Sequence, residues 1–283
     1  MSAHASAAGG PLLEIRGLHI SSPSAPLVRG IDLAVHRGES VGIVGESGSG
    51  KSLTCRSALG IVPDPLRVSA DRLAFDGQDL LTLSERRWRS VRGSRISAVF
   101  QDPASYLNPS LTVGRQLAEV LRIKLGRRRG AARREAVALL DGLGLRDPAR
   151  VATRYPHELS GGMLQRVLIA LAIAEEPDLL IADEPTTALD ATVQAEVLDV
   201  IADLRRERGL ALLFVSHDLA VVAQVCERVL VMRHGVVVEE GRTADVLAAP
   251  RHPYTRALLD AHDEYGLDRL RAHVPSAREV VHV

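Results

Sequence analysis

The segment Gly45–Ser52 limits what this chain can fold into more than any other part of the sequence. It reads Gly-Glu-Ser-Gly-Ser-Gly-Lys-Ser, which matches the pattern G-x-x-x-x-G-K-[ST]. The apolar run Ser40–Val44 precedes it and predicts a buried strand, and a helical pattern follows it. A strand that passes through a glycine-rich loop into a helix offers backbone N–H groups and a helix N-terminus to an anion. We therefore expect an α/β protein with a phosphate-binding loop (the phosphate loop) at this point.

The residue types in the phosphate loop suit a nucleoside triphosphate. The Lys51 ammonium is expected to reach the β- and γ-phosphates and to assist catalysis, and the Ser52 hydroxyl to ligate Mg²⁺. Of 35 Lys plus Arg only Lys51 and Lys124 are lysine, which indicates that this position needs a compact ammonium. The predicted nucleotide-binding residues here are Gly45, Glu46, Ser47, Gly48, Ser49, Gly50, Lys51, Ser52 and Leu53. By itself the loop indicates only a nucleoside triphosphatase.

A pair of acids ends another apolar run. Residues 179–182 read Leu-Leu-Ile-Ala and are followed by Asp183 and Glu184. Carboxyl ends of parallel strands meet at one edge of a sheet, so both acids are expected beside the phosphate loop. There Asp183 would hold Mg²⁺ through water, and Glu184 would polarise the attacking water as a general base. Without the phosphate loop, the same Asp-Glu-Pro sequence would be interpreted as a polar turn.

Strand-like and helical patterns alternate along the chain. Strands are predicted at 12–20, 31–35, 40–45, 72–75, 96–101, 178–183 and 210–216, and a hairpin over 228–240 that turns at His234-Gly235. Helices are predicted after the phosphate loop and at 113–125, 131–142, 162–175, 191–207 and 218–227. This alternation predicts a mainly parallel central sheet covered on both faces. The region of about 102–160 is predicted to be an inserted helical subdomain.

Composition excludes several classes of protein. The formal net charge is zero, so no global field draws the chain to nucleic acid. No apolar run approaches the roughly 18 residues of a membrane-spanning helix. Residues 1–11 are rich in Ala, Ser and Gly and are predicted to be a disordered tail, not a secretory signal. Cys55 and Cys226 fit neither a disulfide framework nor a metal cluster, which indicates small buried residues in the cytosol.

The segment Leu159–Arg166, Leu-Ser-Gly-Gly-Met-Leu-Gln-Arg, begins a second helix with a cap and two glycines. It strongly resembles the signature motif of ABC ATPases. The resemblance implies an ATPase domain over 12–249 with a mainly parallel core sheet, an antiparallel β subdomain and a helical subdomain, using ATP and Mg²⁺. In that family the motif meets the γ-phosphate held by another subunit. Ser160, Gly161 and Gly162 are thereby implied to complete a nucleotide site across a head-to-tail dimer.

Three more positions resemble the functional loops of that family. Gln101, in Phe-Gln-Asp-Pro, resembles the Q-loop residue that senses Mg²⁺ and links to membrane subunits. Asp190, in Ala-Leu-Asp, resembles the D-loop, and His217 resembles the switch histidine that contacts the γ-phosphate. The resemblance thus adds Gln101 and Asp190 to the nucleotide-binding residues and His217 to the catalytic group with Glu184 and Lys51. The metal group becomes Ser52, Gln101 and Asp183.

A narrower resemblance is to the dipeptide, oligopeptide and nickel importer branch. Residues 100–109 and 182–190 resemble that branch, and residues 251–259, Arg-His-Pro-Tyr-Thr-Arg-Ala-Leu-Leu, resemble its C-terminal segment, within a short extension at 250–283. The resemblance implies that ATP-driven dimer closure is coupled to uptake of peptides, with nickel or metallophore uptake as the alternative. A soluble, non-transport ABC ATPase would call for a coiled-coil insertion, zinc cysteines or a fused second ATPase, and the sequence has none of them.

The same branch implies partners and a location. We expect a second ATPase subunit, either a different chain or another copy of this one, two membrane-spanning permeases, and indirectly an extracytoplasmic solute-binding protein. The expected location is peripheral, on the cytoplasmic face of the inner membrane. The first strand lacks the family's adenine-stacking aromatic, which leaves either His19 or an open base contact. Residues 260–283 contain no cysteine, so no iron–sulfur cluster is expected.

Overall fold

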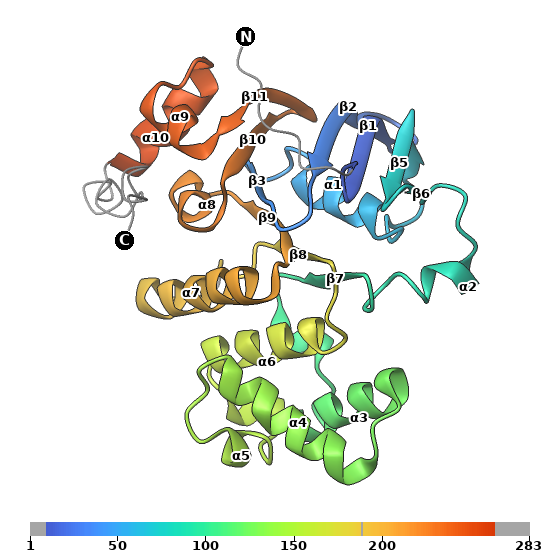
Figure 1. The fold of residues 1–283 in the computed structure, drawn as a ribbon. Coiled ribbons are helices and arrows are strands. Elements are labelled where there is room, and N and C mark those ends of the chain that lie inside the picture. The colour runs from blue at the N-terminus through green and yellow to red at the C-terminus, as the bar shows by residue number, and fades with distance from the viewer. Residues whose placement is uncertain (1–9, 188, 264–283) are drawn as a thin grey trace, which may run out of the picture.

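Two β-sheets build the computed structural model, which describes residues 10–187 and 189–263 (Figure 1). The larger sheet has the strand order β11-β10-β3-β9-β8-β7. Its strands are β3 (Ser40–Val44), β7 (Ile96–Val99), β8 (Leu179–Asp183), β9 (Ala211–Ser216), β10 (Arg228–Arg233) and β11 (Val236–Arg242). All neighbours are parallel except β10 and β11, which form the predicted hairpin. The predicted mainly parallel core sheet is confirmed.

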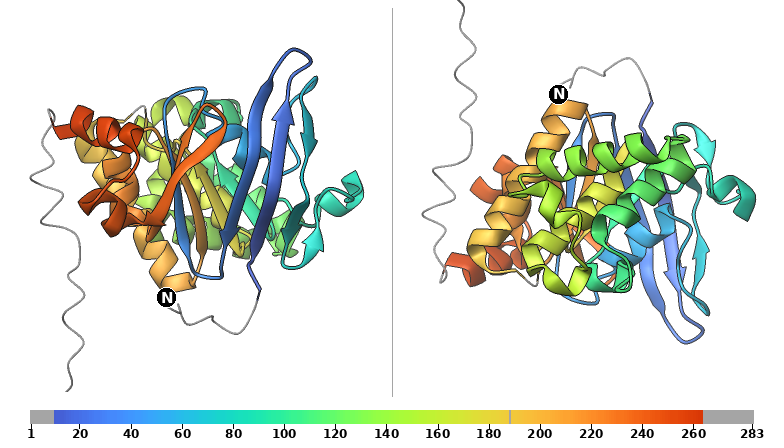
Figure 2. Two further views of the ribbon diagram at one scale, coloured as in Figure 1. Left: turned by 90° about the horizontal axis from the view of Figure 1, so that it is seen from above. Right: turned by 90° about the horizontal axis from the view of Figure 1, so that it is seen from below.

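The second sheet is antiparallel and confirms the expected β subdomain. Its strand β1 (Leu13–Ser21) pairs with β2 (Pro26–Val35), β4 (Arg67–Ser69) and β5 (Arg72–Phe75), and β5 pairs with β6 (Gln78–Asp79). The strand predicted at 31–35 is only the second half of β2. Strands β4 and β6 were not predicted, because such short segments carry too little alternation to be recognised. Figure 2 shows this sheet and the C-terminal helices on opposite sides of the parallel strands.

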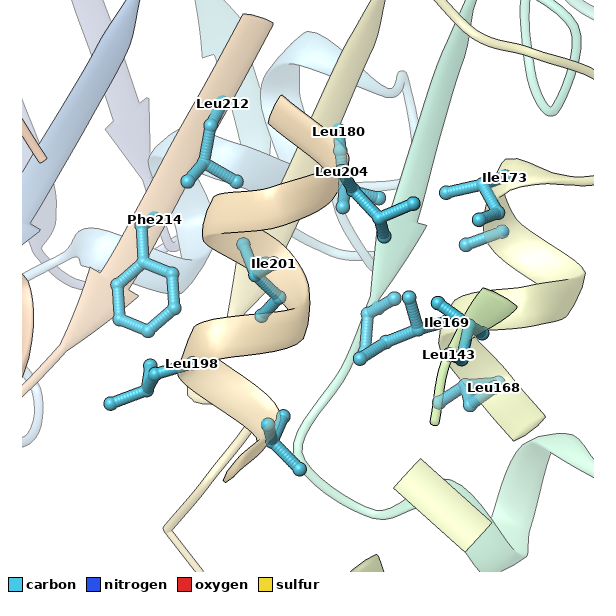
Figure 3. Close-up of a cluster of buried hydrophobic side chains, with 14 of the residues drawn as sticks. Leu143, Leu168, Ile169, Ile173, Leu180, Leu198, Ile201, Leu204, Leu212 and Phe214 are labelled. Atoms are coloured by element: carbon cyan, nitrogen blue, oxygen red, sulfur yellow. The ribbon is translucent and has the colours of Figure 1, made fainter. Parts of the chain in front are cut away.

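Alternation along the parallel strands creates two apolar cores, one on each face of the larger sheet. Leu179 and Ile181 of β8 belong to a core shared with the antiparallel sheet and with helix α1 (Lys51–Ala58), which contacts both sheets. Leu180 and Ala182 point to the other core. Figure 3 shows that second core, in which side chains of α6 (Gly161–Ile173) and α7 (Ala191–Arg208) meet the strands: Ile169, Ile173, Leu180, Leu198, Ile201, Leu204, Leu212 and Phe214.

The region 103–158 is helical apart from its loops and lies away from the antiparallel sheet (Figure 1). It contains η1 (Pro103–Tyr106), α3 (Val113–Leu125), α4 (Arg129–Gly142), α5 (Pro148–Val151) and η2 (Pro156–Glu158). Helix α3 forms because Val113, Leu117 and Leu121 recur at the i, i+4 spacing and are buried. It ends at Gly126, whose φ of 64° is the left-handed conformation typical of a helix C-terminus.

The remaining helices are α2 (Glu85–Trp88), α8 (Leu219–Val225), α9 (Thr243–Ala248) and α10 (Pro253–Asp263). Helix α10 lies against α8 and contains the first part of the C-terminal extension predicted at 250–283. The rest of that extension, residues 1–9 of the predicted N-terminal tail, and Ala188 lie outside the described residues. Among the helices that the structure describes, none combines the length and apolarity needed to cross a membrane.

Candidate nucleotide-binding site

A cavity of about 740 Å³ lies at the carboxyl ends of the parallel strands, where the phosphate loop follows β3. Ligand sites in open parallel sheets occur at this edge. The wall includes residues of the phosphate loop, Glu184 directly after β8 and His217 directly after β9. Gln101, which follows β7, also contributes. The lining residues are Leu27, Glu46, Ser47, Gly48, Gly50, Lys51, Ser52, Leu53, Gln101, Glu184, His217 and Leu258. The structure therefore brings together most of the predicted phosphate, metal and catalytic residues.

The phosphate loop packs on β10 along one side and is open on the other. A Cβ atom on Gly45 would lie 2.1 Å from the Met232 carbonyl oxygen, so only glycine fits against the strand. On the open side, a Cβ atom on Gly48 would meet nothing within 4 Å. The N–H groups of Ser47 and Gly48 donate to no protein acceptor in the described part of the chain. Unpaired N–H donors beside the start of α1 fit the oxygens of a phosphate group.

Lys51 is buried at the base of this loop. Its Nζ donates to the carbonyl oxygens of Gly45 at 2.7 Å and Glu46 at 2.9 Å, and lies 4.0 Å from Oε1 of Glu184. Burial lowers the pKa of Lys51, and the nearby carboxylates of Glu184 and Asp183 act in the opposite direction. The ammonium has thus lost its hydrating water, and the nearby carboxylates offset only part of that loss. A phosphate group in the cavity would supply the missing negative charge.

Ser52 lines the cavity and contacts the buried Asp183. The Ser52 hydroxyl donates to Oδ1 of Asp183 at 2.9 Å. Burial raises the pKa of Asp183, against the effect of this hydrogen bond. The Ser52 hydroxyl and the Gln101 amide line the cavity, and the Asp183 carboxylate adjoins it through Ser52. These are oxygen donors that suit Mg²⁺, and the cation would compensate the buried carboxylate. The three residues predicted to bind metal therefore fit the ion.

Glu184 has an unusual backbone and two close polar neighbours. Its φ is 50°, a left-handed conformation that costs a non-glycine residue about 1–3 kcal/mol and is found preferentially at functional sites. The Glu184 N–H donates to the Val215 carbonyl oxygen at 3.0 Å, which fixes the residue against the end of β9. Its Oε2 accepts a hydrogen bond from the Thr187 hydroxyl at 2.9 Å and lies 3.5 Å from Nδ1 of His217. The carboxylate and the imidazole thus face each other at the cavity.

The signature and D-loop residues lie elsewhere. Ser160 is the N-cap of α6, and its hydroxyl accepts from the Met163 N–H at 3.4 Å. Asp190 caps α7, and its carboxylate accepts from backbone N–H groups of that helix. Of the described residues that line the phosphate cavity, none belongs to Ser160–Gly162 or is Asp190. Within one chain, these residues and the phosphate loop form separate surfaces.

Gly162 also has a packing role that the sequence did not indicate. A Cβ atom there would lie 2.2 Å from Cγ1 of Val193, so the start of α6 touches α7 with no space for a methyl group. Packing alone therefore explains a glycine at this position.

Sequence reasoning missed several residues of the site. Leu27, at the start of β2, and Leu258, in α10, form part of the cavity wall. The Tyr254 hydroxyl lies beside the loop and accepts a hydrogen bond from the Glu46 N–H at 2.8 Å. The segment around Tyr254 was recognised only as a family marker, because nothing local links two residues 208 positions apart.

His19 does not take the role of the missing aromatic. Its Nδ1 lies 2.9 Å from the Gly17 carbonyl oxygen, its ring lies beside Gly30, and it is not among the described residues that line the cavity. The first strand directs His19 to an exposed face of the antiparallel sheet, because residues alternate between the two faces. The open base contact is the alternative that agrees with this geometry.

Comparison with known proteins places this site in a family. A family model described as ABC transporter matches residues 28–187, more than half of the 283 residues. A second model, described as oligopeptide/dipeptide transporter, C-terminal region, matches residues 238–281. The first match includes the phosphate loop, the signature segment and the acid pair, and the second includes Tyr254.

Individual proteins agree with both matches. The dipeptide transport ATP-binding protein DppD of Escherichia coli (strain K12) is 46% identical over 256 residues, covering 90% of this chain and 78% of that protein. The oligopeptide transport ATP-binding protein OppD of Bacillus subtilis (strain 168) is 44% identical over 253 residues, covering 88% and 71%. The dimeric ATP-binding cassette MJ0796, in a post-hydrolysis state bound to ADP and Pi, has a TM-score of 0.69 at 27% identity, covering 82% of this chain and 98% of that one. The chain therefore belongs to the ABC transporter family, as an ATP-binding subunit with the C-terminal region of the oligopeptide/dipeptide branch.

Proposed function

We propose that the chain hydrolyses ATP to drive the uptake of peptides. The observation that carries the proposal is the presence, in one chain, of a buried lysine and acid pair on a phosphate-loop cavity and of the C-terminal region of oligopeptide/dipeptide transporters. Similar proteins are named for dipeptide and oligopeptide transport. These names favour peptides over nickel or a metallophore as the solute.

The geometry supports separate roles for the site residues in ATP hydrolysis. The loop N–H groups and Lys51 would hold the β- and γ-phosphates, and Ser52, Asp183 and Gln101 would hold Mg²⁺, which neutralises phosphate charge when bound. Glu184 would accept a proton from the attacking water, because its carboxylate lies on the cavity and is oriented by the Thr187 hydroxyl. His217, 3.5 Å from Glu184, would contact the γ-phosphate.

We infer that the working unit contains two ATPase subunits. Ser160, Gly161, Gly162 and Asp190 do not line the phosphate cavity of their own chain, as far as the described residues show, so they are available to a second one. MJ0796, a similar cassette, is dimeric. The second subunit is either a related ATPase or another copy of this chain.

Two permeases would complete the transporter and hold this subunit at the cytoplasmic face of the membrane, with a solute-binding protein on the other side. The segment after Gln101 suits a permease contact. Tyr106 there is 51% exposed and its ring stacks on Phe100 at a centroid distance of 5.3 Å. An exposed aromatic surface joined directly to a residue of the nucleotide cavity can transmit the state of the site to a partner.

Transport in proteoliposomes tests the proposal. The chain would be purified with its permeases, a second ATPase subunit if one co-purifies, and its binding protein, and ATP would be enclosed with the subunit. A labelled dipeptide, a labelled pentapeptide and ⁶³Ni²⁺ would be compared, with Glu184→Gln vesicles as the control. ATP-dependent peptide uptake is expected. Uptake of nickel alone would replace the peptide proposal by its alternative, and recovery of only soluble partners would contradict a transport function.

A further inference from the structure

The C-terminal helix α10 contacts the phosphate loop directly. The Tyr254 hydroxyl accepts a hydrogen bond from the Glu46 N–H at 2.8 Å. The Tyr254 side chain is buried. Burial raises the pKa of Tyr254, so the hydroxyl stays protonated and able both to accept and to donate. One turn later, Leu258 forms part of the wall of the nucleotide cavity.

Tyr254 is held in place by the β10–β11 hairpin. The Arg233 guanidinium lies over its ring, 4.7 Å from the centroid. The Glu239 carboxylate accepts the N–H groups of Arg251 at 2.8 Å and His252 at 3.0 Å. Burial acts to raise the pKa of Glu239, but the pKa is lowered overall, with these N–H donors among the causes. The start of α10 is therefore anchored to a strand of the core sheet by charge-assisted hydrogen bonds.

The backbone of Glu46 contacts both this anchor and the phosphate-binding residues. Its N–H is satisfied by Tyr254, while its carbonyl oxygen accepts from Nζ of Lys51 at 2.9 Å and from the Ser49 N–H at 3.2 Å. Lys51 and the loop turn thus bond to the carbonyl group of a residue whose N–H is bonded to α10.

From this geometry we propose that Tyr254 is a positioning residue of the phosphate loop, through which docking of Pro253–Asp263 and binding of nucleotide strengthen each other. The inference rests on the proposed role of the loop in binding ATP. Without the tyrosine hydroxyl, the Glu46 N–H loses its acceptor and the phosphate loop loses this hydrogen bond to α10. The loop then has to be ordered by the nucleotide at a cost in affinity. By reciprocity, bound nucleotide stabilises the docked helix.

Removing one oxygen atom tests the proposal. Tyr254→Phe keeps the ring under Arg233 and loses only the hydroxyl, and Tyr155→Phe makes the same change on a tyrosine of the helical subdomain. Calorimetry on the full chain measures the Kd for ATP, and hydrolysis in the reconstituted transporter gives KM and kcat. For Tyr254→Phe we expect Kd and KM to rise about 3- to 10-fold, as for loss of one hydrogen bond, with kcat within about twofold of wild type. Tyr155→Phe should match wild type.

A second measurement reports on the stability of helix α10. Amide hydrogen exchange over residues 255–260 should slow when ATP is added to wild type and should change less in Tyr254→Phe. An unchanged or lower Kd in Tyr254→Phe overturns the proposal, as does a fall in kcat at constant KM, which would indicate only a loss of folded protein. Absence of ATP binding by wild type would instead overturn the proposed function, so the two failures are distinguishable.

Discussion

At the amino ends of the parallel strands, Arg37 and Arg95 each bind both Asp76 and Asp178, whereas at the carboxyl ends Lys51 and Asp183 are buried with their charges incompletely matched. The four groups at the amino ends form a closed ring of ion pairs. This ring joins the turn before β3, the turn after β5 and the residues that precede β7 and β8. It fastens the antiparallel sheet to the core.

The directions of the pKa shifts at the two edges are opposite. Hydrogen bonds from Arg95 and Arg37 lower the pKa of Asp76, and the Asp76 and Asp178 carboxylates raise that of Arg95, so folding favours the charged forms. At the carboxyl ends, burial raises the pKa of Asp183 and lowers that of Lys51, so folding disfavours the charged forms of both side chains. One edge of the sheet contributes to stability, and the other holds charge that a ligand would compensate.

The largest expected effect is on turnover at the carboxyl edge. Glu184→Gln keeps the size of the side chain and removes the proton acceptor. We expect hydrolysis to fall by at least about a hundredfold, with ATP affinity unchanged and a closed dimer trapped on ATP. Steady-state hydrolysis of wild type and variant in the reconstituted transporter measures the effect. A rate within about tenfold of wild type would remove Glu184 from the role of base.

A smaller effect is expected for nucleotide affinity. Lys51→Ala removes the ammonium that faces the cavity, and a lost charge-assisted hydrogen bond corresponds to roughly 10- to 100-fold in Kd. Calorimetry with ATP measures it, and Lys124→Ala removes the only other lysine of the chain as a control. Equal affinities of wild type and Lys51→Ala would contradict the phosphate contact.

The contrast between the two edges of the sheet is tested further by Asp183→Asn, which should raise stability and impair Mg²⁺ binding. The change removes a carboxylate that burial disfavours, so we expect the thermal midpoint of the nucleotide-free chain to rise, on the order of 2 °C. Mg²⁺ should at the same time cease to strengthen ATP binding. Differential scanning calorimetry and titrations with and without Mg²⁺ give both quantities. A lower midpoint would mean that the charge is stabilising and would end the contrast between the edges.

The smallest effect is expected at the amino edge. Asp76→Asn should lower the free energy of unfolding by about 1 kcal/mol or less at pH 7, because the ring is partly exposed, and leave ATP affinity unchanged. Because folding lowers the pKa of Asp76 below its ordinary 3.8, the stability it contributes is present above that value and is lost as the pH falls through the lowered pKa. Urea unfolding of wild type and variant at a series of pH values measures this. If the difference in unfolding free energy between wild type and Asp76→Asn grew as the pH fell, the stabilising role of the Asp76 carboxylate would be contradicted.

The parts of the site that the sequence predicted are those coded by adjacent residues. The phosphate loop and the Asp183-Glu184 pair could be located because each follows a buried strand directly, and parallel strands bring their ends together. That rule places Lys51, Ser52, Asp183 and Glu184 together, whereas Gln101 and His217 are assigned by the resemblance to ABC ATPases. The parallel sheet, the hairpin and most helices were predictable for the same reason, since long apolar periodic segments are locally specified.

Contacts between distant segments were not predictable. Tyr254 meets Glu46 only because α9 and α10 fold back along β10 and β11, and no local pattern encodes that return. Leu27 in the cavity wall was not predicted, because β2 begins at Pro26 and the apolar pattern indicated only its second half. The left-handed backbone of Glu184 is likewise a property of its packing against β9, which overrides the preference of a glutamate.

The close contact of Gly162 with Val193 restricts how the signature segment can move. Sliding α6 along α7 would drive the Val193 methyl into backbone, because the space beside Gly162 is smaller than one carbon atom. Rotation about that point of contact leaves the spacing intact. A reorientation of α6 relative to α7 that preserves this contact therefore has to turn about Gly162.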